Sequence, residues 1–294
     1  MSVTSLSEYI EVILDRPTSH NTVATYRGHG SIEFRLQPSI FRKAVTRESE
    51  HILLRELIAA HPEDFNSDTS ALETLVRMQH YSLPTRLLDV SLNPLVALYF
   101  ACESIKKRIP IKRAGRPSTK TVEMDGHVVV LHVTKRRIRY FDSDTVSCLA
   151  NLARLSWTHK SKLDTDLERD VFNNSLPAKR LLHFIRQEKN GFLSEIEPRD
   201  LDRIMLVKPK LNNKRILAQA GAFFAFGLNE EIGEDNRDGI KVDRITIDGH
   251  SKGEILKQLD KLGINEKTLF PEIERAARYI TGTLSTGDTA SEII

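Results

Sequence analysis

The stretch QHYSLPTRLLDVSLNPLVALYFA, residues 79–101, carries strand and helix signals in close succession. RLLDV (86–90) is a short apolar run after Pro84, which is typical of a buried strand. Asn93 and Pro94 then form a helix start, with an N-cap side chain followed by a proline at the first helical position. The helix that follows is apolar almost all round, so we expect it to lie in the core.

Further strands and helices surround this stretch without strict alternation, which favours an α+β fold over a doubly wound parallel sheet. A continuous apolar run predicts the clearest strand, at residues 127–133. Two more apolar runs predict strands at 203–209 and 221–227, and VDRITI predicts a further strand at 242–247. Helical spacing predicts helices at 70–81, 252–263 and 272–280.

The length and composition fit a single globular domain over residues 1–294, with 40% hydrophobic and 28% charged residues. We expect a helical N-terminal region up to about residue 72, interrupted by a strand-like segment at 27–42. The signature and sheet core would span about 73–250. C-terminal helices at 251–282 and a frayed tail at 283–294 would complete the chain.

The sequence predicts a cytoplasmic protein. No run approaches 18 apolar residues, and the N-terminus lacks the basic residues and apolar core of a signal peptide. Cys102 and Cys148 stand in apolar surroundings without a partner motif. We therefore expect two buried free thiols in a reducing compartment.

Basic residues concentrate in two places. The segment 106–120 contains seven basic residues, two prolines and no acid, which predicts a solvated, mobile loop. A second basic run, KRRIR, lies at 135–139. Both runs are interpreted either as solvated faces or as surfaces that attract RNA or DNA phosphates.

The common catalytic motifs are absent from the sequence. It has no phosphate-binding loop of the Walker type, no Gly-x-Gly-x-x-Gly after a strand, no His-Glu-x-x-His and no Gly-x-Ser-x-Gly. Two distant cysteines also argue against a structural zinc site. These absences disfavour the usual kinase, hydrolase, dinucleotide-fold and metalloenzyme interpretations.

Two arginines stand beside apolar strand segments, where a charge is costly unless it meets an acid or an anionic ligand. Arg27 lies between Tyr26 and Gly28, and no acid follows it until Glu33. We therefore favour an anionic ligand for Arg27, with the neighbouring glycines letting that ligand approach the backbone. Arg86 has two interpretations, a structural ion pair with Asp89 or a ligand contact.

Other polar residues near these arginines also have two interpretations. His80 ends a predicted helix, where a cationic ring is favourable, or it acts as an acid or base. Ser91 caps the following helix or takes part in catalysis. Thr85 and Gln219 are further hydrogen-bonding candidates beside predicted strands.

These segments resemble the FRG domain family, which has an aromatic-Arg-Gly motif like Tyr26-Arg27-Gly28. The stretch at 79–101 resembles the central signature of that family. LLHFIRQEKNGF, RILAQAGAFFAFG and LFPEIERAARYI follow in the expected order. The resemblance spans roughly Ser5 to Ile280, and Ser82 stands where the family usually has glycine.

A second resemblance is to ADP-ribosyltransferases of the Arg–Ser–Glu type, which use NAD as co-substrate. It implies an ADP-ribosyltransferase-like mixed sheet, with Arg27 as the strand arginine and Ser91 as the serine of the second motif. Gln219 would stand where such enzymes place a glutamate, so an acid such as Glu195 or Glu197 would have to come from elsewhere. This resemblance predicts Arg27, Ser91, Gln219 and His80 as catalytic, and Tyr26, Arg27, Gly28, Thr85 and Arg86 as NAD-binding residues.

The leading hypothesis is an ADP-ribosyltransferase-like protein that uses NAD to modify a nucleic acid or a protein. A toxin or phage-defence effector with an antitoxin partner would suit such a chain by analogy. The first alternative is a non-catalytic module that binds a nucleotide and acts as a sensor. The second alternative is a metal-independent nuclease that uses His80.

Overall fold

The computed structural model describes residues 2–17, 19–113, 116–193, 195–210, 213–234 and 239–272. Its main feature is an eight-stranded mixed sheet with the order β1-β10-β6-β2-β3-β9-β8-β7. The pairs β1–β10 and β7–β8 are parallel, and the other pairs of this sheet are antiparallel. The mixed α+β architecture agrees with the prediction from the sequence.

The strands of the large sheet have these bounds: β1 (Ser2–Val3), β2 (Thr22–His29), β3 (Leu87–Ser91), β6 (Gly126–Thr134), β7 (Ile138–Tyr140), β8 (Ile204–Lys208), β9 (Gly221–Phe226) and β10 (Ile240–Ile247). The predicted strands at 86–90, 127–133, 203–209, 221–227 and 242–247 are confirmed. The first four are apolar runs whose side chains are largely buried, and the segment 242–247 buries Val242, Ile245 and Ile247 between polar residues.

The predicted strand-like segment at 27–42 is wrong in its position. Strand β2 begins earlier and pairs with β6 from Thr22↔Thr134 to His29↔His127. Residues after Gly30 leave the sheet, and a 3-10 turn, η1 (Ser39–Arg42), follows Pro38. Strand β2 contains polar and small residues and no continuous apolar run, so the sequence pattern does not predict it as a strand. Its pairing with the apolar strand β6 places it in the sheet.

The helices have these bounds: α1 (Leu6–Leu14), α2 (Ala44–Glu48), α3 (Glu50–Ala60), α4 (Pro62–Phe65), α5 (Ala71–His80), α6 (Pro94–Ala101), α7 (Asp144–Asn151), α8 (Trp157–Lys160), α9 (Arg169–Asn174), α10 (Leu176–Glu188), α11 (Lys214–Ala218), α12 (Lys252–Lys261) and α13 (Glu266–Leu269). Asn93 caps α6 through its side-chain oxygen, as the sequence predicts. The expected helix at 272–280 and the tail at 283–294 lie outside the described residues. No helix of the described part is long and apolar enough to cross a membrane.

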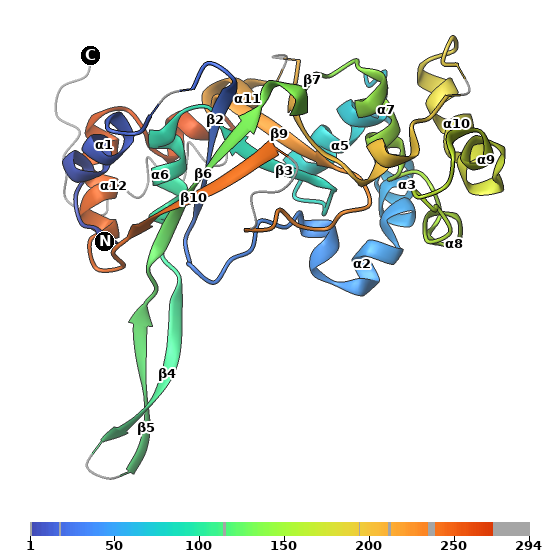
Figure 1. Cartoon of the computed structure of the whole chain (residues 1–294). Helices are drawn as coiled ribbons and strands as arrows, with labels where there is room; N and C mark the ends of the chain where they lie inside the picture. The colour runs from blue at the N-terminus through green and yellow to red at the C-terminus, as the bar shows by residue number, and fades with distance from the viewer. Residues whose placement is uncertain are drawn as a thin grey trace.

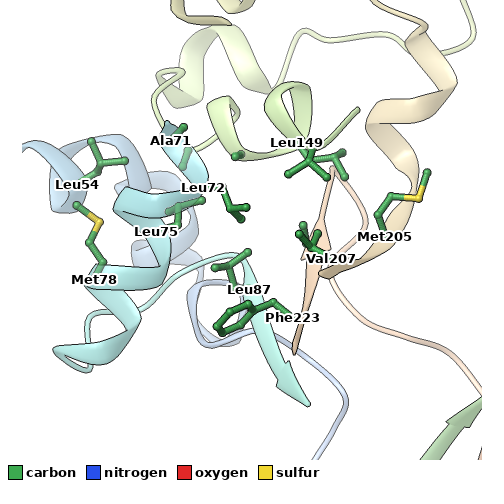
Figure 2. Close-up of a cluster of buried hydrophobic side chains, with 14 of the residues drawn as sticks. Leu54, Ala71, Leu72, Leu75, Met78, Leu87, Leu149, Met205, Val207 and Phe223 are labelled. Atoms are coloured by element: carbon green, nitrogen blue, oxygen red, sulfur yellow. The ribbon is translucent and has the colours of Figure 1, made fainter. Parts of the chain in front are cut away.

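The helices divide into two groups along the sheet (Figure 1). Helices α1, α6 and α12 share one core cluster with side chains of β6 and β10. Helices α5 and α7 share another with β3, β8 and β9. Figure 2 shows part of this second cluster, in which Leu72 and Leu75 of α5 lie near Leu87 of β3 and Phe223 of β9.

The basic segment at 106–120 forms an antiparallel hairpin, so the prediction of a loop is wrong, although most of its described side chains are exposed as expected of a solvated segment. Strands β4 (Lys106–Arg113) and β5 (Arg116–Glu123) pair from Lys106↔Glu123 to Arg113↔Arg116 as a separate two-stranded sheet. Pro110 is tolerated because such a ribbon has two edges, where a missing N–H costs little. The hairpin projects from the body of the protein and leads into β6 (Figure 1).

Candidate functional site at a gap in the sheet

The large sheet has a gap between β2 and β3. These strands pair only at Tyr26↔Ser91, whereas β3 pairs with β9 from Leu87↔Ala225 to Ser91↔Gly221. A cavity of about 530 Å³ lies at this gap and is lined by residues of both strands and of α6. Its lining includes Tyr26, Arg27, Gly28, His29, Asp89, Ser91, Phe100 and Gln219.

The side chain of Arg27 bridges the gap. Its Nη1 donates to the Asp89 carbonyl oxygen at 2.5 Å, and its Nε donates to Nε2 of His29 at 2.9 Å. Burial lowers the pKa of the Arg27 guanidinium, an effect that nearby Asp89 opposes, and a guanidinium stays charged in either case. Among the described residues no carboxylate forms an ion pair with Arg27, so its charge is available to an anion in the cavity.

Two buried histidines hold this arginine in place. His29 Nε2 accepts from Arg27, so its proton is on Nδ1, which donates to Nε2 of His127 at 2.9 Å. Burial and the charge of Arg27 lower the pKa of His29 to about 2. Burial and Arg244 lower the pKa of His127 to about 4, so both rings are neutral at pH 7. The sequence analysis missed His29, although Arg27 and His29 are two residues apart on a strand and therefore share a face.

The glycines beside Arg27 serve helix packing. A Cβ at Gly28 would lie 1.9 Å from the Ala97 carbonyl oxygen and 2.5 Å from the Ala101 nitrogen, both in α6. A Cβ at Gly30 would lie 2.9 Å from the Glu103 carbonyl oxygen. These glycines let α6 and the chain that follows it approach β2 closely. Both also line the cavity, so the expectation that they let a ligand approach the backbone stays a prediction.

Ser91 and Gln219 lie at the same cavity as Arg27. The Ser91 hydroxyl donates to the Gln219 carbonyl oxygen at 2.7 Å and accepts from the Asn93 nitrogen at 2.9 Å. The Gln219 side-chain amide donates to the Leu269 carbonyl oxygen at 3.1 Å. The structure thus brings together Arg27, Ser91 and Gln219, and Ser91 helps to turn the chain from β3 into α6.

Arg86 and Thr85 lie away from this cavity. Arg86 is completely buried and forms a two-pronged ion pair with Glu50, with Nε–Oε1 at 2.8 Å and Nη2–Oε2 at 2.5 Å. Its Nη1 also donates to the carbonyl oxygens of Phe226 and Gly227. The partner of Arg86 is therefore Glu50, and the expected pair with Asp89 is wrong. The hydroxyl of Thr85 is buried and bonds to the Gln79 side chain.

His80 lies in a neighbouring small cavity. It is the last residue of α5, and its Nδ1 is 3.6 Å from Glu272 Oε1. This second cavity, of about 50 Å³, shares Asp89, Arg215 and Gln219 with the larger one. His80 therefore lines the small cavity and not the larger one that contains Arg27.

Three carboxylates line the larger cavity, which the sequence analysis did not foresee. They are Glu33, Asp89 and Glu103. Glu33 is engaged by Lys107 Nζ at 2.5 Å, whereas the exposed side chain of Asp89 forms no ion pair within the described residues. Glu195 instead lies 3.6 Å from Arg169, and neither it nor Glu197 lines the cavity.

The arginines around the cavity outnumber these acids. Arg35 and Arg215 both line it. The Arg35 guanidinium lies 3.4 Å from the Glu231 carboxylate, and the Arg215 guanidinium lies 3.9 Å from the Glu272 carboxylate. Arg42 lines it too and donates to the Gln37 carbonyl oxygen at 3.4 Å. Arg27 and Arg42 form no ion pair among the described residues, so their guanidinium groups are the ones that suit a phosphate group.

Cys102 and Cys148 are free and buried, as predicted, and burial raises the pKa of each thiol to about 12. In the described ranges, no group of three or more His, Cys, Asp or Glu side chains is arranged to hold a metal ion. The KRRIR segment forms a 3-10 turn and β7, where Arg139 donates to the carbonyl oxygens of Arg136 and Ile138.

Residues 22–109 match the family model of the FRG domain. This finding supports the FRG family. The matched segment contains β2, β3 and α6, and therefore most of the cavity wall. No curated protein and no solved structure matches the chain.

Proposed function

We propose that this chain is an ADP-ribosyltransferase-like protein that binds NAD in the cavity between β2 and β3. The observation that carries the proposal is the charge of Arg27, which faces the cavity without a carboxylate partner in the described part of the chain. The diphosphate of NAD supplies the missing anion. A volume of about 530 Å³ is suitable for a cofactor-sized ligand, and Tyr26, Phe34 and Phe100 offer flat apolar surface for its rings.

The residues of the cavity also fit the transfer step. Cleavage of the nicotinamide–ribose bond builds positive charge on the ribose, and the bonding electrons leave with nicotinamide. The acceptor then forms a bond to the same ribose carbon and releases a proton. We assign Asp89 to stabilise the ribose cation and receive that proton, because it lies beside Arg27 and Gln219 and has no ion pair of its own among the described residues.

A second candidate function is a nucleotide sensor without turnover. It is favoured by Gln219 and Ser91, whose side chains already bond to backbone atoms and carry no negative charge. Such a site binds a nucleotide through Arg27 but lacks the glutamate expected of the Arg–Ser–Glu type. The two candidates differ in whether NAD is consumed.

The test is incubation of the purified protein with NAD labelled on the adenylate phosphate, together with cell DNA, RNA or protein. We expect label transfer by the wild type and its loss in Arg27→Ala and in Asp89→Asn. Binding of NAD without transfer would support the sensor instead. RNA cleavage without NAD would support the nuclease alternative and overturn both. The cytoplasmic location, the toxin or defence role and the antitoxin partner stay predictions.

A further inference from the structure

The hairpin β4–β5 is a long two-stranded ribbon that stands away from the rest of the protein (Figure 1). Each strand runs for 8 residues, which at roughly 3.3 Å per residue gives a ribbon about 26 Å long. A two-stranded hairpin is only marginally stable in water by itself. An extension of this size that contributes no residue to the described core clusters points to a role in binding.

The charge on this ribbon is almost entirely positive. Residues 106–120 include seven basic residues and no acid. Lys106, Arg108 and Lys120 are exposed, and none of them forms an ion pair within the described residues. Glu123, at the base, accepts from Ser104 Oγ and the Ile105 nitrogen and lies 3.8 Å from Lys252 Nζ. The positive charge of these three exposed residues is therefore not neutralised within the described part of the chain, as expected of a surface that meets a polyanion.

We infer that this ribbon binds duplex DNA by lying in the major groove. The major groove of B-form DNA is wide enough to admit a two-stranded β-ribbon, whereas the major groove of duplex RNA is deep and narrow. Residues 106–123 contain no aromatic residue, so the ribbon has no platform on which unpaired bases could stack. Its lysines and arginines would instead contact phosphates on both sides of the groove.

The base of the ribbon meets the rim of the Arg27 cavity. Glu103 lines the cavity and lies three residues before β4. Glu33 also lines the cavity and binds Lys107 of the ribbon. DNA held on the ribbon therefore passes close to the cavity mouth. DNA binding by the ribbon does not depend on the proposed function. Only the idea that this DNA also accepts ADP-ribose rests on it.

The experiment measures binding by fluorescence anisotropy without NAD, between 50 and 200 mM salt. The probes are a fluorescein-labelled 24-base-pair DNA duplex, one of its single strands, and an RNA duplex of the same sequence. The test variant combines Lys106→Gln, Arg108→Gln and Lys120→Gln. The control variant combines Lys162→Gln, Lys179→Gln and Arg180→Gln, which are exposed residues elsewhere and give the same net charge.

We expect the wild type and the control variant to bind the DNA duplex best. The hairpin variant should bind the DNA duplex about tenfold more weakly or worse. The slope of its log affinity against log salt concentration should be less steep than that of the wild type by about 2.7, which is about 0.9 for each of the three lost phosphate contacts. Equal binding by the two variants would overturn the inference. So would a preference for single strands or RNA, or no binding at 50 mM salt. Arg27→Ala should keep full DNA affinity, which separates this test from that of the proposed function.

Discussion

In the proposed function, Arg27 has a binding role in addition to the structural role that its hydrogen bonds show. It donates across the gap to the Asp89 carbonyl oxygen and along its own strand to His29. Both acceptors are neutral, so these bonds orient the guanidinium without cancelling its charge. By contrast, Arg86 is fully buried and its charge is matched by Glu50. Because Glu50 neutralises Arg86 whereas no carboxylate of the described residues pairs with Arg27, we propose a binding role for Arg27 and a structural role for Arg86.

The buried pair of Arg86 and Glu50 leads to a stability prediction. Burial raises the pKa of Glu50, but Arg86 and Lys160 outweigh that effect and hold it at about 2. Glu50→Gln would leave two buried cations without an anion, so we expect a loss of about 3–5 kcal/mol in unfolding free energy. The measurement is urea unfolding followed by circular dichroism. The exposed Glu56→Gln on the same helix is the control, and a loss below about 1 kcal/mol at Glu50 would contradict the assignment.

The two buried histidines predict how stability depends on pH. Their folded-state pKa values, about 2 for His29 and about 4 for His127, lie below the ordinary 6.5. The unfolded chain therefore binds more protons below pH 6.5, and the unfolding free energy should fall as pH drops from 6.5 to 4. His127→Gln removes one of these groups and should make that dependence shallower.

Chemical unfolding at several pH values checks this expectation. Replacement of the exposed His61 by Gln serves as the comparison, because it removes a histidine without touching the buried pair. An equally steep dependence in wild type and His127→Gln would show that His127 is not kept neutral by the fold.

The residues of the site were only partly predictable from the sequence. Arg27 could be assigned to an anion because no acid follows it closely, and Ser91 and Gln219 because they flank predicted strands. Glu50 could not be found as the partner of Arg86, because 36 residues separate them and no spacing rule links them. Asp89 was considered as the partner of Arg86 only because it is near in the sequence.

The contact between β2 and α6 determines the wall of the cavity. Gly28 has no side chain, and the space that a Cβ would need is filled by the backbone of α6. Because backbone cannot move aside like a flexible side chain, the helix itself must shift if this position is filled. The shape of the cavity therefore depends on the close packing of Gly28 against α6.

Gly28→Ala should destabilise the protein by about 1–3 kcal/mol, because it overpacks the contact with α6. It should also weaken nucleotide binding, because Ala97 and Phe100 of the displaced helix line the cavity. Thermal unfolding and nucleotide titration measure the two effects. Gly253→Ala in α12 has open space around it and should be neutral or slightly stabilising. Wild-type stability in Gly28→Ala would contradict this account.

The strands that were predicted correctly from apolar runs are recognisable by themselves, and the strands that were missed have no such run. Strands β3, β6, β8 and β9 are apolar along most of their length and are recognisable without knowledge of their partners. Strand β2 is mixed and becomes a strand through its pairing with β6. The hairpin β4–β5 carries charge and prolines, which favour a loop in any analysis of the sequence alone.

Considered as a whole, the molecule consists of a sheet with helices and one protruding ribbon (Figure 1). The described hydrophobic core clusters contain residues of the large sheet, its helices and its loops, and none from β4 or β5. We therefore expect that the body folds without the ribbon. The ribbon would then be an addition for binding and would contribute little to stability.

Replacement of residues 108–121 by Asn-Gly tests this expectation. The sequence Asn-Gly favours a tight hairpin turn, and retention of Lys107 and Glu123 keeps the contacts at the base. We expect the melting temperature of the shortened protein to stay within a few degrees of the wild type. A loss of cooperative unfolding would show that the ribbon is part of the folding unit.

The central claim is that the Arg27 guanidinium holds the diphosphate of a nucleotide, and calorimetric titration with NAD measures this directly. The variants are Arg27→Ala, Arg27→Lys and the exposed control Arg180→Ala, each with its melting temperature recorded. Loss of a charge-assisted bond costs about 1.5–3 kcal/mol, so Arg27→Ala should bind NAD at least about tenfold more weakly, with Arg27→Lys between it and the wild type. The control should match the wild type. If a folded Arg27→Ala binds NAD as tightly as the wild type, the Arg27 guanidinium does not hold the diphosphate, and the central claim is wrong.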